Sequence, residues 1–159
     1  MSELTIALVL HVLAVVIWIG GVSMVTTVII PTIRNRKMAE EQQIALFSAI
    51  ERRFVWQARG AVLIVGLTGF YMVDRLALWP TLASLQYWWV FAMVVVWLLF
   101  ASILFIFEPL FLHRRFEERA KSAPEHTFAL LQRMHWILLL LSAIAIFGGI
   151  AGSHGLTVF

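Results

Sequence analysis

Residues 4–30 read LTIALVLHVLAVVIWIGGVSMVTTVII, an apolar run that ends at Pro31. An α-helix needs about 20 apolar residues to cross the hydrocarbon core of a bilayer, so this run is long enough to span one. It lacks a basic region at its start, so we expect a membrane span rather than a cleavable signal peptide. Its one ionisable side chain is that of His11. The stretch therefore predicts a membrane protein and raises the question of what this histidine does.

The rest of the chain follows the same pattern. Of 159 residues, 62% are hydrophobic and 13% are charged, whereas a soluble domain is about 45–50% apolar and about 25% charged. Further spans are predicted at about residues 54–73, 87–112 and 134–152. We expect one domain over residues 1–159 with an all-α fold, an integral membrane antiparallel four-helix bundle. Because the chain stays helical in character around the third loop, the last two helices are expected to extend into the cytoplasm.

Basic residues lie almost entirely on one side of these spans, and only Arg75 lies on the other. The positive-inside rule then places both long loops in the cytoplasm and both termini in the periplasm of a bacterial inner membrane. Because these residues adjoin apolar spans, the expected partner is the lipid bilayer and not nucleic acid. The chain has no Cys, which excludes disulfides and thiolate metal sites. The basic residues on the loop side are Arg34, Arg36, Lys37, Arg52, Arg53, Arg59, Arg114, Arg115, Arg119, Lys121 and Arg133.

Two histidines are expected at similar depth. His11 precedes Ile30 by 19 residues, and His154 follows His135 by 19 residues. At 1.5 Å per residue, each lies roughly 28 Å above the inner interface. The first helix carries Ala7, Ala14, Trp18 and Gly21 on the face of His11, and glycines surround His154. Small residues of this kind leave room for another helix or a flat ring.

Imidazole nitrogens suit iron and copper, and two histidines from opposed helices can hold a haem in a bundle. We therefore predict that His11 binds a cofactor, with His154 as its partner. The alternative is that His11 hydrogen-bonds a neighbouring helix and that His154 lies in a wet tail. Met72 and Met93 are expected near the same level, and their thioethers are the fallback ligands for haem or copper.

A second group of polar residues lies at the cytoplasmic boundary. Glu108 ends the third span, with His113 just beyond it, while Arg59 begins the second span and His135 the fourth. An unpaired charge at such a position is costly, so an ion pair between Arg59 and Glu108 is predicted. The functional alternative is an inner haem or metal site built from His135 and His113, with Arg59 near the propionates.

The segment LHVLAVVIWIGGVSM resembles the first helix of the copper-resistance D (CopD) membrane domain, which opens with His, several apolar residues and Trp-x-Gly-Gly. The segment ERRFVWQARGAVLIVGLTGFYM is similar to the Arg-Phe…Leu-x-x-Thr-Gly helix of that family. The opening also resembles the haem-biosynthetic HemJ family, which is similar to a protoporphyrinogen oxidase. The first resemblance implies copper binding or uptake. The second implies a haem ligand at His11.

Three functions are consistent with these patterns. The first is a b-type haem protein of the inner membrane that acts in electron transfer or haem handling. The second is a copper-binding or copper-uptake protein, and the third is a structural membrane subunit without a cofactor. A haem centre would serve a membrane oxidoreductase, with a redox protein or a quinone as its partner. A homo-oligomer is compatible with each of the three.

Overall fold

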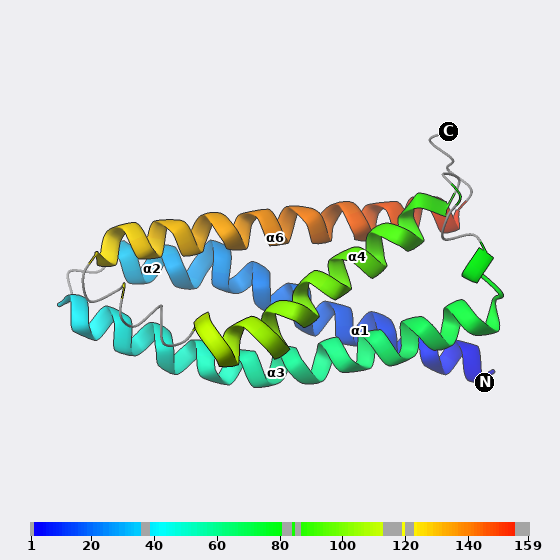
Figure 1. Cartoon of the computed structure of the whole chain (residues 1–159), viewed down its shortest axis with the longest axis horizontal. Coiled ribbons are helices and arrows are strands. Elements are labelled where there is room, and N and C mark those ends of the chain that lie inside the picture. Colours follow the sequence, from blue (N-terminus) through cyan, green and yellow to red (C-terminus); the bar gives the residue numbers. More distant parts are fainter. Residues whose placement is uncertain are drawn as a thin grey trace.

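The computed structural model describes residues 2–35, 39–80, 84, 87–112, 119 and 123–154. Nearly all of them are helical, and this part of the chain contains no strand. Four helices are long and apolar enough to cross a membrane, which confirms the predicted all-α membrane fold. The elements, where η marks a π-helical segment, are α1 (Glu3–Met24), η1 (Val25–Ile29), α2 (Ile30–Asn35), α3 (Glu40–Arg75), α4 (Trp88–Ser102), η4 (Ile103–Leu112) and α6 (Pro124–Ser153) (Figure 1).

The first helix packs mainly on α3. The buried residues of α1 are Ala7, Ala14, Trp18 and Val22, so the face predicted around His11 is the one that faces the protein. On α3, Ala58, Ala61, Val62, Val65 and Gly66 are buried in return. Small residues on both faces allow the two backbones to lie close together.

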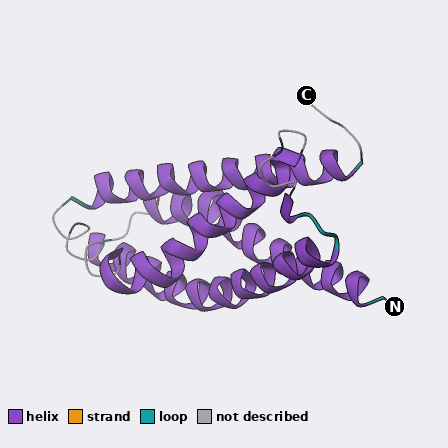
Figure 2. Ribbon diagram, turned by 45° about the vertical axis from the view of Figure 1, so that its right-hand side comes forward, coloured by secondary structure: helices purple, strands orange, loops and turns teal. Residues whose placement is uncertain are grey.

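Helix α4 continues into η4, and together they cross the molecule diagonally, from α6 at one end to α3 at the other (Figures 1 and 2). Near its start, the Trp88 and Trp89 rings lie where side chains at Gly148 and Gly152 of α6 would be. The glycines near His154 were expected to leave room for another helix or a flat ring. Another helix takes this space, because the indole rings of α4 lie there.

Prolines accompany both π-helical segments. Pro31 follows η1 closely, and Pro109 lies inside η4. Proline has no N–H and cannot continue the hydrogen-bond ladder of a helix. In the i to i+5 register of a π-helix, Pro109 stands opposite the Leu104 carbonyl and has no N–H to donate to it. Arg59 of α3 supplies the missing donor, with its Nε 3.0 Å from the Leu104 oxygen.

The end of the molecule that holds the junctions α2–α3 and η4–α6 is called the loop end below. Here Phe47 of α3 and Phe128 of α6 meet edge to face, with ring centroids 5.6 Å apart. Helix α3 begins at Glu40, well before the predicted start of the second span at residue 54. The fourth helix begins at Pro124, well before the predicted start of its span at residue 134. The expected extension of the third helix falls on residues 113–122, of which the structure describes only Arg119.

Candidate functional site

A cavity of about 540 Å³ lies in the half of the molecule near the loop end. Pockets that hold small molecules and cofactors are typically about 300–1,000 Å³ and mostly apolar. All four membrane-spanning helices contribute residues to the wall of this cavity. Both π-helical segments also contribute, η1 through Val25 and η4 through Leu104. Because π-helical turns occur frequently at functional sites, the position of both beside one cavity marks it as the candidate site.

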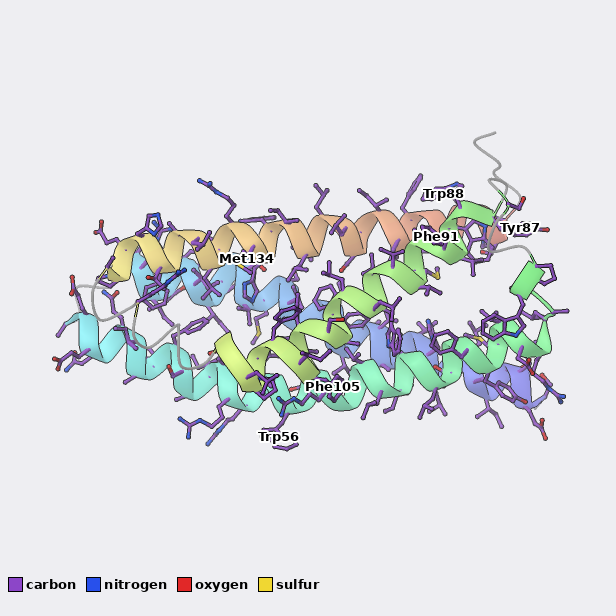
Figure 3. The ribbon with its side chains drawn as sticks, in the orientation of Figure 1. Trp56, Tyr87, Trp88, Phe91, Phe105 and Met134 are labelled. Atoms are coloured by element: carbon purple, nitrogen blue, oxygen red, sulfur yellow. The ribbon has the colours of Figure 1, made fainter. Side chains whose placement is uncertain are left out.

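Glu108 is a charged residue of the cavity wall, and it is held by Arg59. Arg59 Nη2 lies 2.6 Å from Glu108 Oε2, so the predicted ion pair is confirmed. The guanidinium also lies 5.1 Å from the centre of the Trp56 ring and 5.9 Å from that of Phe105. Figure 3 shows these two rings where α3 and η4 meet. The charge is thus neutralised and covered by aromatic faces, which lowers its cost in an apolar segment.

His135 lies on the same wall, half-buried on α6. Its Nδ1 is 2.9 Å from the Leu131 carbonyl oxygen. A carbonyl can only accept, so Nδ1 is the protonated nitrogen and Nε2 keeps its lone pair. This hydrogen bond orients the ring in the way that a partner of the second nitrogen does in metal-binding histidines. Among the histidines that the structure describes, His135 is therefore the one that lines the cavity, and its Nε2 has a lone pair available to bind a metal.

Trp18 contributes a buried donor at the cavity wall. Its ring packs edge to face on Phe100, with centroids 4.7 Å apart. The indole Nε1 is buried and has no hydrogen-bond partner within the described part of the chain. A buried N–H without a partner costs about 1–3 kcal/mol, and native proteins rarely leave one. Helical periodicity predicts Trp18 on the inner face of α1, but no sequence pattern predicts a site for it.

His11 lies away from this wall, between α1 and α3. Its Nδ1 is 3.0 Å from Thr68 Oγ1, and the Thr68 hydroxyl donates to the Ile64 carbonyl at 2.6 Å. Because the hydroxyl proton is already used, the His11 Nδ1–H must be the donor, and Nε2 keeps its lone pair. The ring also lies against Gly69. The alternative in which His11 bonds a neighbouring helix is what the geometry shows, and the ligand role stays a prediction.

The other predicted ligands are spread out. His154 is exposed, and its Nδ1 bonds the Ile150 carbonyl at 2.8 Å, while His11 bonds α3. The first turns of α1 lie beside α3, and the last turns of α6 lie beside α4 (Figures 1 and 2). Met93 contacts Gly149, and Met72 is half-buried on α3. His113 lies outside the described residues. Within the described ranges no three His, Asp or Glu side chains converge as a metal site.

Comparisons with protein-family models, with curated proteins and with solved structures return no match. The resemblances to the CopD and HemJ families therefore stay expectations that rest on short motifs. The function has to be inferred from the cavity and its wall.

Proposed function

We propose that this protein binds haem b in the cavity near the loop end and acts in electron transfer or haem handling. The observation that carries the proposal is a mostly apolar cavity of about 540 Å³ with His135 on its wall. Its volume and apolar character suit a large flat cofactor. The buried Trp18 N–H at the same wall is an unused donor for a polar group of such a ligand.

Haem is favoured over copper by the ligands that each one needs. A haem brings four nitrogens of its own, so the protein has to supply only one or two axial ligands. A copper ion held by the protein alone needs several converging side chains. Among the residues that the structure describes, no three His, Asp or Glu side chains come together as such a group, and neither expected thioether ligand, Met72 or Met93, lines the cavity. A single oriented histidine on a cavity wall therefore suits haem better.

The residues of the wall would divide the work. His135 Nε2 would bind the iron, and the Leu131 carbonyl would keep the imidazole ring in place. The apolar residues of the wall would exclude water, and Arg119 on the wall would place a positive charge near the propionates. The Arg59–Glu108 pair fixes η4 to α3 and so holds the opposite side of the cavity. The bound haem would supply a one-electron redox centre.

The spectrum of the purified protein tests this proposal. When haem is added in detergent, we expect a Soret band with sharp reduced α and β bands. His135→Ala should lose most of the Soret absorbance, since the axial nitrogen is gone. His126→Ala is the matched control, because His126 is exposed on the same helix. A wild-type protein that stays colourless contradicts haem binding. If His11→Ala rather than His135→Ala abolishes the band, the haem site lies at the other end of the bundle.

The membrane setting is part of the same proposal. The bundle would lie antiparallel in a bacterial inner membrane, with the loop end in the cytoplasm, because in the sequence eleven of the twelve Lys and Arg residues lie in or beside the two long loops. Reporter fusions at residue 37 and residue 121 are expected to be active as fluorescent proteins and inactive as alkaline phosphatase. Fusions at residue 82 should show the reverse. Phosphatase activity at residue 37 or 121 contradicts this orientation.

A further inference from the structure

The cavity wall is buried on one side and exposed on the other. Residues that α1, η1 and α3 contribute are buried or half-buried, such as Val22 with 3% of its surface exposed. The exposed wall residues are Phe107 of η4, Leu130 and Met134 of α6, and Arg119 between these two helices. Phe107, Leu130 and Met134 are each 40–49% exposed. The mouth of the cavity therefore lies between η4 and α6.

The rim of this mouth is apolar on both sides. Ile106 next to Phe107, and Ile137 on the turn after Met134, are also exposed and apolar. The two helices that form the mouth, α4 with η4 and α6, are each long and apolar enough to span a membrane. Exposed apolar side chains on the membrane-spanning part of such a helix face lipid rather than water, and Phe107, Met134 and Ile137 fall within the spans predicted from the sequence. Arg119 is the charged residue of the exposed rim as far as the structure describes it.

One side of the mouth is a π-helical segment. The rim residue Phe107 lies in η4, whose register is π-helical and whose Pro109 cannot donate a backbone hydrogen bond. The Arg59–Glu108 pair ties η4 to α3 and not to α6. A ligand that passes between η4 and α6 would therefore not have to break this ion pair.

From these features we propose that the cavity is loaded sideways from the bilayer, through the mouth between η4 and α6. The ligand is a flat amphiphile dissolved in the membrane, with an apolar body for the cavity and an acidic group for Arg119. That this amphiphile is haem rests on the proposed function. Lateral loading favours haem handling, in which the protein takes up or passes on a membrane-dissolved porphyrin, over a permanently held redox centre.

The absence of cysteine from the chain allows a test that does not depend on haem. The buried part of the wall, opposite the mouth, is called the cavity floor. Val22→Cys places one thiol on this floor, and Val55→Cys places a thiol at a second buried position of the wall. Each variant is reconstituted in liposomes and exposed to an apolar maleimide, which enters the bilayer, or to a sulfonated maleimide, which stays in water. Because both reagents attack the same thiol, the ratio of their rates reports the route of access and not the reactivity of the thiol.

The apolar maleimide is expected to label the thiol at least about tenfold faster than the sulfonated one does. Adding Met134→Trp at the mouth should slow labelling by the apolar maleimide about tenfold, which corresponds to an increase of roughly 1.4 kcal/mol in the barrier. Ile144→Trp is the matched control, because it adds the same ring to an exposed position of α6 that neither lines the cavity nor lies at its mouth. Its labelling rate should equal that of the parent.

Two results would overturn lateral loading: equal labelling by both reagents, or a Met134→Trp variant that labels like the Ile144→Trp control. When haem is supplied in the liposomes instead of maleimide, Met134→Trp should slow the uptake of haem without changing the final Soret absorbance. A protein that passes the maleimide test but binds no haem keeps the lateral mouth and loses the haem assignment. The two proposals can therefore fail separately.

Discussion

Arg59→Met is expected to destabilise the protein by about 3–5 kcal/mol, the usual cost of removing one partner from a buried ion pair. The Arg59 and Glu108 side chains are only 18% and 20% exposed, so water does little to screen the remaining carboxylate. The substitution also removes the donor to the Leu104 carbonyl, to which Pro109 has no N–H to donate. Methionine keeps most of the apolar volume, so the loss reports charge and hydrogen bonding rather than packing.

Reversible unfolding of the purified protein in mixed micelles measures this effect. Arg52→Met is the control, because Arg52 is exposed on the same helix and its loss should change stability by no more than about 0.5 kcal/mol. The double variant Arg59→Met with Glu108→Gln should recover part of the stability, since no unpaired charge remains. An Arg59→Met protein as stable as Arg52→Met would show that the ion pair is not a structural element of the bundle.

Gly66→Ala is expected to be the most damaging single-methyl change in α3. A Cβ at Gly66 would overlap the Trp97 ring of α4. That ring cannot move aside freely, because its Nε1 donates to the Val62 carbonyl at 2.9 Å. Overpacking costs about 1–3 kcal/mol, and the lost hydrogen bond adds about 1 kcal/mol.

Gly60→Ala provides the opposite expectation on the same helix. A Cβ at Gly60 has nothing within 4 Å, and alanine is a better helix former than glycine by up to about 1 kcal/mol. The two alanine variants should therefore shift the unfolding midpoint in opposite directions. If both stabilise the protein to the same degree, the close contact between α3 and Trp97 is not formed.

The four helices and the ion pair could be predicted from the sequence because each depends on a local property. Long apolar runs mark the spans, and two opposite charges in such runs need each other. The inner face of α1 followed from helical periodicity around His11. In the structure, Ala7, Ala14 and Trp18 are buried on that face.

The cavity could not be predicted, because it depends on the direction in which whole helices cross. The rise per residue gives the depth of a histidine in the membrane but not the side of the bundle on which it lies. His11 and His154 were paired by their depth and by the small residues beside each, and neither feature fixes the side of the bundle on which a residue lies. The structure bonds His11 to Thr68 and leaves His154 exposed at the end of α6. Pro109, inside the third predicted span, was the signal in the sequence that could have pointed to the site.

The contact between Arg59 and the Leu104 carbonyl has a consequence for how this protein can change during evolution. Arg59 fills a gap in the backbone bonding of another helix, and the gap exists because residue 109 is a proline. A relative with an N–H at position 109 could close its own ladder and would have one reason fewer to keep an arginine at position 59. The two positions are therefore expected to be inherited together, although they lie on different helices, and losing the arginine should be tolerated best after the proline has gone.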